Sequence, residues 1–289
     1  MRRVGRYWIE DPRTVQGRDD VSPRGWNLGA VRLRSVLDAL RPVRGRVLIP
    51  GCGAGRYVRA IGRERPDLWL VGGDLSRTAI REARQRDPGG RYLVFDACRM
   101  PFGSERFDAV VFLDVLEHVP EPEAMINECA RVLRGGGVFH AFVPLEAQPG
   151  TLYWLLRRSE RWPIHQWKRD HVGHVQRFSD VDVLRLLGLA GLEVQAVRYS
   201  FHVIGQIHDV LDYWQRERSS GAPGSLPTWA VRLVTRIVFL VTWRLAAAED
   251  LVYRGRAFAA GLHVTAYKPT WAERRTAERI RVGNERWEG

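Results

Sequence analysis

The sequence predicts an α/β protein built on a doubly wound, mostly parallel β-sheet. Five short apolar runs alternate with segments of helical periodicity between residues 46 and 144. The runs are continuously apolar rather than alternating, which is typical of strands covered on both faces. A loop with three glycines follows the first run, and sheets of this kind bind ligands at the carboxyl ends of their strands.

The elements follow one another regularly as far as Pro144. Residues 1–26 mix Arg, Asp, Gly and Pro and are expected to be irregular, as a candidate lid over a site. Apolar residues at helical spacing predict a first helix at 28–40. Helices are then expected to end at Pro66, at Pro88 and at the glycines after residue 134, with Ser76 as the N-cap of the middle one. Strands are expected at 46–50, 68–74, 91–96, from 107 onward and at 138–144.

The second half of the chain is less regular. Residues 151–179 are aromatic, basic and rich in histidine, and a helix followed by a strand is expected up to residue 200. A helix-rich segment and a final strand at 261–269 come next. We therefore expect five segments: a lid and first helix (1–45), a ligand-binding core (46–200), a helical insertion or cap (201–256), a final core strand (257–270) and a polar tail (271–289).

Charge and cysteine content narrow the function classes. The net charge of +12 in 289 residues favours anionic partners such as nucleic acid, membrane lipid or acidic substrates. However, Lys168 and Lys268 are the only lysines, and scattered arginines suit a general coding bias equally well. The three cysteines form no CxxC pair, which argues against a disulfide framework or a zinc site and for a reducing cytoplasm. No apolar block follows the first residues, so we expect no secretory signal.

The glycine loop has the spacing Gly51-x-Gly53-x-Gly55. A strand, a glycine loop and a helix N-terminus together form a cradle for an anion or a nucleotide. The dehydrogenase spacing would place its third glycine where Arg56 stands, and the Gly-Lys-Ser/Thr of a phosphate-binding loop is absent. The alternative is a tight turn without a ligand.

Four stretches in a fixed order point to one family. They are "VLIPGCGAGRY", "LVGGDLSRTAI", "FDACRMPF" and "FDAVVFLDVLEHV", all between residues 46 and 144. Together they resemble the motifs of class I S-adenosylmethionine-dependent methyltransferases, in the small-molecule branch similar to quinone and lipid methyltransferases. The resemblance implies a Rossmann-like sheet of seven strands, the last one antiparallel. The helix-rich segment 201–256 is then expected to form a helical cap inserted between strands six and seven, where many relatives have a direct connection. It also implies S-adenosyl-L-methionine as the cofactor.

The resemblance also implies which residues contact the cofactor. Asp74 ends the second strand, where a carboxylate accepts hydrogen bonds from ribose hydroxyls. Asp96 ends the third strand and is the candidate partner of the adenine amine; for each aspartate the alternative is a helix cap or a surface turn. The family usually has an acidic residue where this chain has Ile49, and Asp114 is the candidate replacement. The expected set is Pro50, Gly51, Cys52, Gly53, Gly55, Asp74, Leu75, Asp96, Ala97, Leu113 and Asp114.

Three histidines are candidates for catalysis. Methyl transfer from a sulfonium mainly requires alignment, and a base is needed only when the acceptor must lose a proton. His118 follows the fourth strand, and His171 and His174 lie in a segment that covers the active site in the resembling family. Each of the three can instead be structural. The spacing His171-x-x-His174 is typical of metal ligands, but no cysteine or acidic cluster completes it in the sequence, so no metal is predicted.

Residues 229–253 form the most apolar stretch of the chain. Arg232, Arg236 and Arg244 interrupt it, which argues against a membrane span and for an amphipathic helix. This helix either packs as a cap over the sheet edge or lies in an anionic membrane interface. An apolar cap at this point favours a partly hydrophobic acceptor.

The sequence therefore predicts methyl transfer to a small-molecule or lipid-like acceptor by a cytoplasmic enzyme, with O-, N- and C-methylation all open. One alternative is an RNA methyltransferase, although no known RNA-binding module is present and residues 113–116 lack the motif of base-amine methylating enzymes. Nucleic acid is therefore not the expected partner. The other alternative, which Ile49 motivates, is a non-catalytic cofactor-binding or membrane-associated protein.

Overall fold

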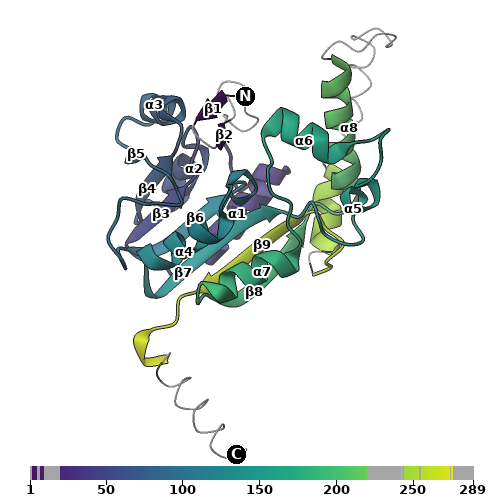
Figure 1. Cartoon of the computed structure of the whole chain (residues 1–289). Coiled ribbons are helices and arrows are strands. Elements are labelled where there is room, and N and C mark those ends of the chain that lie inside the picture. Colours follow the sequence, from purple (N-terminus) through teal and green to yellow (C-terminus); the bar gives the residue numbers. More distant parts are fainter. Residues whose placement is uncertain are drawn as a thin grey trace, which may run out of the picture.

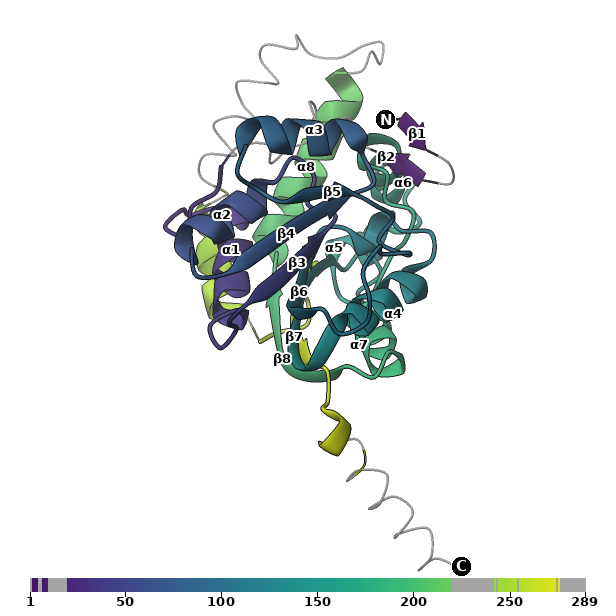
Figure 2. The same cartoon turned by 90° about the vertical axis from the view of Figure 1, so that its left-hand side faces the viewer.

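A computed structural model describes residues 2–4, 7–9, 20–219, 242, 244–253, 255–273 and 275. Its centre is a seven-stranded sheet in the order β5-β4-β3-β6-β7-β9-β8 (Figures 1 and 2). The strands β3 to β7 run parallel, and β9 pairs antiparallel with both β7 and β8. This confirms the doubly wound sheet with an antiparallel last strand. The strands are β3 (Arg46–Pro50), β4 (Trp69–Asp74), β5 (Tyr92–Val94), β6 (Phe107–Leu113), β7 (Leu133–Pro144), β8 (Glu193–Ser200) and β9 (Gly261–Tyr267).

Helices cover both faces of the sheet. In Figure 2, α1, α2 and α3 lie on one side and α4 and α7 on the other. Each side has its own apolar cluster: Val47 and Val111 pack toward Leu33 and Ile61, whereas Val110 belongs with residues of α4 and α7. Adjacent residues of one strand thus face opposite layers, as their continuous apolar runs predict. The helices are α1 (Leu28–Ala39), α2 (Arg56–Glu64), α3 (Arg77–Arg86), α4 (Pro122–Val132), α5 (Leu152–Leu156), α6 (Ile164–Val172), α7 (Asp180–Leu189) and α8 (Val203–Ser219), with a 3₁₀ turn η1 (Leu116–His118).

Helix starts agree with the sequence. The Ser76 hydroxyl accepts a hydrogen bond from the Ala79 N–H at 3.2 Å, which confirms Ser76 as the N-cap of α3. Ser179 caps α7 in the same way, and Asp182 completes a reciprocal capping box with it.

The predicted glycine stop after α4 is wrong. The helix ends at Val132, and β7 begins at once with Leu133 and runs through residues 135–137. Gly136 N–H donates to the Lys268 carbonyl at 2.7 Å, and Lys268 N–H donates to the Gly137 carbonyl at 3.1 Å. The glycine backbone is therefore paired with the chain that follows β9. A partner about 130 residues away leaves no mark on the local sequence.

The N-terminal segment is more ordered than expected. Two short strands, β1 (Arg2–Val4) and β2 (Tyr7–Ile9), pair antiparallel with Arg3 opposite Trp8. Aromatic and β-branched residues such as these favour strand pairing. Residues 10–19, also in the predicted irregular lid, lie outside the described part of the chain.

The predicted helix at 229–253 lies largely outside the described residues. Residues 244–253 are helical and dock on the start of α8. Asp250 accepts hydrogen bonds from the N–H groups of Phe201 and His202, and Glu249 accepts one from Ile204. Among the described residues no helix is long and apolar enough to cross a membrane. The division of the chain into five segments stays a prediction.

Two buried histidines between β7 and β9 make stability depend on pH. His140 bonds Thr265 Oγ1 at 2.9 Å and His263 bonds Ser200 Oγ at 3.0 Å. Burial lowers the pKa of His140 from 6.5 to about 3, and lowers the pKa of His263 as well. Because the unfolded chain takes up the protons and the folded chain does not, stability is complete above pH 6.5 and falls as pH drops toward 3.

We expect the free energy of unfolding to fall by about 1.4 kcal/mol per pH unit for each such histidine below its unfolded pKa. Urea titrations between neutral pH and about pH 5 measure this slope. The matched variant His140→Gln keeps a polar side chain beside Thr265 and should flatten the slope by the share of one histidine. An unchanged slope in this variant would contradict the assignment.

Candidate functional site

The carboxyl ends of four neighbouring strands meet at one edge of the sheet. The register pairs Pro50 of β3 with Gly73 of β4, and Asp74 with Val94 of β5. The same edge includes the end of β6, where Leu113 pairs with Phe142. The loops that carry the predicted cofactor residues therefore converge, as expected for a parallel sheet.

The three glycines of the loop differ in what a side chain at each position would contact. Gly51 and Gly55 have φ of +69° and +79°, and a Cβ there would lie 2.3 Å from Val115 and 2.8 Å from the Tyr92 hydroxyl. Close packing therefore requires glycine at both positions. A Cβ on Gly53 would meet nothing within 4 Å, although its φ is +54°. The backbone at Gly53 thus faces open space, which a ligand can approach.

Asp74 joins the end of β4 to the glycine loop. One carboxylate oxygen accepts the Gly53 N–H and the other accepts the Ser76 N–H, both at 2.8 Å. Burial raises the pKa of Asp74, against the two amide hydrogen bonds. Each carboxylate oxygen has two acceptor positions, so both oxygens retain capacity for a ligand hydroxyl.

Asp96 stands just beyond β5 at the same edge. Its Oδ1 accepts the Cys98 N–H at 2.8 Å, which folds the side chain over its own turn. Ala97 and Cys98 are half-buried within this turn. The turn therefore presents a carboxylate and backbone groups side by side.

Asp114 follows β6 and forms an ion pair that the sequence did not indicate. Its backbone is left-handed, with φ of +54°, and its Oδ1 lies 2.8 Å from a guanidinium nitrogen of Arg32 on α1. The same guanidinium lies over the Phe142 ring at 4.0 Å. Ile49 is buried in the core beneath α1. The helix thus brings an arginine next to the carboxylate predicted to compensate for Ile49.

The remaining predicted cofactor residues line the same loops. Burial raises the pKa of the Cys52 thiol, so this cysteine is not a reactive thiolate. The others are Pro50 and Leu113, which are buried, and Leu75, which is half-buried.

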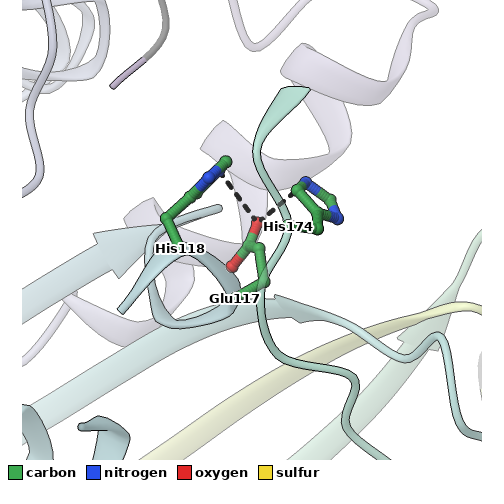
Figure 3. Close-up of side chains that lie close together, drawn as sticks. All are labelled: Glu117, His118 and His174. Carbon is green, nitrogen blue, oxygen red and sulfur yellow. Dashed lines mark ion pairs between the residues drawn. The ribbon is translucent and has the colours of Figure 1, made fainter. Parts of the chain in front are cut away.

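A cluster of Glu117, His118 and His174 lies beyond the end of β6 (Figure 3). Both histidines place Nε2 at 3.9 Å from the same oxygen of Glu117, Oε1. Glu117 is 1% exposed, and in the described part of the chain neither of its carboxylate oxygens has a hydrogen-bond partner. The rings of His118 and His174 are nearly perpendicular, with centroids 4.9 Å apart.

Backbone hydrogen bonds explain why His174 reaches this cluster. The carbonyl of Glu117 accepts the N–H groups of Val175 and Gln176 at 2.9 and 3.0 Å. The Gln176 side chain donates to the Pro120 carbonyl, and His118 Nδ1 donates to the Gly173 carbonyl. The segment 173–176 is therefore fixed against η1 and the residues after it.

The surroundings of the cluster shift the pKa of each of its three members away from its usual value. Burial raises the pKa of Glu117 to about 8. Burial, reinforced by His174, lowers the pKa of His118 to about 3. Burial also opposes a charge on His174, but Glu146 outweighs it and raises the pKa of that imidazole.

Glu146 connects the cluster to a second group of charges. This buried carboxylate bonds His174 Nδ1, accepts from His165 Nδ1 at 3.2 Å and lies 3.5 Å from Lys168 Nζ. Burial works against its charge, yet the adjacent cations hold the pKa of Glu146 well below its usual range. Lys168 also pairs with Asp209 of α8 at 3.1 Å.

The structure separates the three predicted histidines. His118 and His174 come together, whereas His171 bonds Glu217 at 3.0 Å on α8. The sequence missed Arg32, Glu117, Glu146 and Lys168. Only Glu117 had a local signal, since it precedes His118; a buried glutamate and an exposed one look alike in sequence.

Comparisons with known proteins find similarity to methyltransferases. Residues 48–141 match the family described as "Methyltransferase domain". A ubiquinone/menaquinone biosynthesis C-methyltransferase of Desulfotalea psychrophila is 35% identical over 46% of this chain and 52% of its own length. A ubiquinone biosynthesis O-methyltransferase of Coxiella burnetii is 29% identical over 60% and 78%, respectively. The chain spans about half the length of most of the curated relatives it matches.

A solved structure confirms the fold. Phosphoethanolamine N-methyltransferase 2 of Haemonchus contortus, in complex with S-adenosyl-L-methionine, superposes with a TM-score of 0.56 at 19% identity. The alignment covers 84% of this chain and 54% of that one. The sheet therefore has the Rossmann-like fold of that structure, and the strands β3 to β7 lie largely within the residues that match the methyltransferase-domain family.

Proposed function

We propose that the protein transfers a methyl group from S-adenosyl-L-methionine to a small-molecule acceptor with an apolar part. One observation carries the proposal: at the carboxyl edge, Asp74 meets the open backbone of Gly53, and Asp96 lies one strand further on. This arrangement suits a nucleoside whose sugar and base lie across adjacent strand ends. The methyltransferase-domain match over the same residues supports it.

We assign the following roles within this proposal. The carboxylate of Asp74 accepts the ribose hydroxyls, and Asp96 accepts the adenine amine, with Leu75 and Ala97 against the ring. Asp114 faces the ammonium end of the methionine, and the neighbouring Arg32 faces its carboxylate. The glycine loop, Pro50, Cys52 and Leu113 contact the cofactor from the side of the sheet.

The acceptor then approaches from the side of His118. In an in-line displacement the protein aligns the acceptor atom with the methyl carbon and excludes water. The cluster of Glu117, His118 and His174 begins three residues after Asp114, so it lies beside the methionine end of the cofactor. A contact between His171 and the acceptor stays a prediction, since that side chain bonds Glu217.

Isothermal titration calorimetry of the full chain tests the proposal. We expect S-adenosylmethionine and S-adenosylhomocysteine both to bind with a measurable heat. If neither ligand gives one, both methyltransferase hypotheses fail, for small molecules and for RNA. If both bind, a polyanion column tests the RNA hypothesis against the small-molecule hypothesis. An RNA-binding protein is retained at low salt and released as salt increases, because binding to phosphates weakens steeply with salt.

We further propose that the protein binds a membrane surface, because its proposed acceptor is partly apolar. The curated relatives are named as ubiquinone biosynthesis enzymes. Leu251 and Val252, on the described part of the insertion, are 54% and 75% exposed. Exposed apolar side chains on a basic protein favour an anionic bilayer interface. We therefore propose a cytoplasmic protein that binds the membrane surface.

Flotation with anionic vesicles tests this location. We expect the full chain to float with vesicles containing phosphatidylglycerol, and a deletion of residues 227–256 to abolish flotation. Neutral vesicles are the control. Failure of the full chain to float with anionic vesicles at low salt would contradict membrane association without affecting the methyltransferase proposal.

A further inference from the structure

The cluster of Glu117, His118 and His174 contains acceptor atoms without donors. The Glu117 carboxylate is buried and has no hydrogen-bond partner among the described residues. Two imidazole nitrogens lie 3.9 Å from its Oε1, which is beyond hydrogen-bond length. An unpaired carboxylate in such a place is costly, and burial of this kind is compensated by pairing or by a metal.

Hydrogen bonds on the outer side fix the tautomers of both histidines. His118 Nδ1 lies 3.2 Å from the Gly173 carbonyl, which can only accept, so Nδ1 bears the proton. His174 Nδ1 bonds the Glu146 carboxylate. In the neutral imidazoles both Nε2 atoms therefore offer a lone pair. Figure 3 shows these two nitrogens on either side of one Glu117 oxygen.

We propose that Glu117 Oε1, His118 Nε2 and His174 Nε2 bind one divalent transition-metal ion. The three ligand atoms lie within 4.8 Å of one another. A Zn²⁺ ion at about 2.1 Å from each ligand places tetrahedral ligands ~3.4 Å apart. The two 3.9 Å separations therefore close by about half an ångström on binding, and the two imidazole nitrogens approach each other from at most 4.8 Å.

The outer hydrogen bonds match those of known metal centres. Metal-bound histidines generally donate their second N–H to a carboxylate or a backbone carbonyl, which orients the ring and strengthens the ligand. Here Glu146 and Gly173 supply one of each. Two imidazoles and one carboxylate favour zinc, iron or cobalt over Mg²⁺ and Ca²⁺, which prefer ligand sets made of oxygens alone.

Two neighbouring groups stay outside the ligand set. Asp114 is held by Arg32 at 2.8 Å. His165 is directed to Glu146, so it supports His174 rather than the ion. Three protein ligands leave at least one coordination position open, as in catalytic rather than structural sites. The His118 side chain is 28% exposed, so solvent reaches this side of the cluster.

An open coordination position lets the ion bind the acceptor of the proposed methyl transfer. This step rests on the proposed methyltransferase function. Binding to the ion lowers the pKa of an acceptor hydroxyl, which then releases its proton to water. The resulting oxygen anion attacks the methyl carbon; the O–C bond forms as the S–C bond breaks, and the sulfonium becomes a neutral thioether. The inferred acceptor class is therefore one with an ionisable hydroxyl.

Cobalt binding by the full chain tests the metal site directly. After removal of metals with a chelator, we expect the protein to bind one Co²⁺ per chain, with a visible d–d absorption that Zn²⁺ abolishes. His118→Ala and His174→Ala should each weaken binding by about 100-fold or more, because even loss of an outer partner costs about 10–100-fold. Glu117→Gln, which keeps the side-chain volume, should weaken it similarly.

His171→Ala is the matched control, since it removes a histidine from the same segment outside the cluster. It should bind Co²⁺ like the unmodified chain, and circular dichroism should show that all four variants are folded. Absence of Co²⁺ binding by the unmodified chain, or equal losses in His171→Ala and His174→Ala, would overturn the metal site.

Calorimetry with S-adenosylmethionine on the metal-free protein separates this inference from the proposed function. We expect the cofactor to bind with or without Co²⁺, because no ligand of the ion is assigned to the cofactor. Co²⁺ binding without cofactor binding would leave the metal site standing and contradict the methyltransferase function. Cofactor binding without Co²⁺ binding would contradict the metal site and leave the methyltransferase function standing.

Discussion

Replacement of Asp74 by alanine should lower the affinity for S-adenosylmethionine by about 100-fold or more. Hydrogen bonds to a charged group contribute about 1.5–3 kcal/mol each, and the proposed ribose contact makes two of them. The variant also frees the Gly53 N–H, which Asp74 holds at 2.8 Å, and so loosens the loop. Isothermal titration calorimetry gives the affinity, and thermal unfolding shows whether the variant is folded.

Asp67→Ala is the matched control for this experiment. Asp67 precedes the other end of the same strand and pairs with Arg65 at 2.7 Å on the surface. Its removal should leave cofactor affinity unchanged. If Asp74→Ala is folded and binds the cofactor as tightly as Asp67→Ala does, the assignment of Asp74 to the ribose is wrong.

The variant Lys168→Met should lose about 3–5 kcal/mol of stability, the usual cost of removing one partner from a buried ion pair. The Lys168 side chain is 6% exposed and lies 3.1 Å from Asp209 and 3.5 Å from Glu146. Its ammonium also lies over the Tyr153 ring at 4.2 Å. Methionine fills a similar volume but removes the ammonium from Asp209 and leaves Glu146 with the imidazoles of His165 and His174. Urea unfolding followed by fluorescence measures the loss.

Lys268→Met provides the comparison, because Lys268 is the only other lysine of the chain. It pairs with Glu105, whose side chain is half exposed, and donates to the Leu133 carbonyl. An exposed ion pair contributes about 0–1 kcal/mol and the hydrogen bond about 1 kcal/mol, so the loss should be smaller. Equal losses in the two variants would show that the buried charges near Glu146 do not stabilise the fold.

The buried charges also link stability to the candidate site. Lys168 and His174 both face Glu146, so the same cation that stabilises α6 against α8 holds the carboxylate that orients His174. We therefore attribute the position of His174 to packing of the segment 151–179 rather than to its own local structure. The two histidines therefore separate in spite of their spacing: the second joins the cluster and the first one bonds Glu217.

The cofactor edge, by contrast, was visible in the sequence. The glycine loop, Asp74 and Asp96 each follow an apolar run within a few residues, and parallel strands end on the same side of a sheet. Local chain geometry therefore brings them together without further information. The Arg32–Asp114 pair was not visible, because the two residues are 82 positions apart and come from a helix and a strand end.

The sequence by itself determined the doubly wound sheet, its strand ends and the residues predicted to hold the cofactor. These depend on hydrophobic periodicity, turn residues and caps, which act over a few residues. Only the tertiary structure decided that β7 begins directly after α4 and that Glu117 is buried. It alone also brought His118 and His174 onto one carboxylate oxygen. Those features depend on which distant segments share a hydrogen bond or exclude water from a charge, and no local pattern records that.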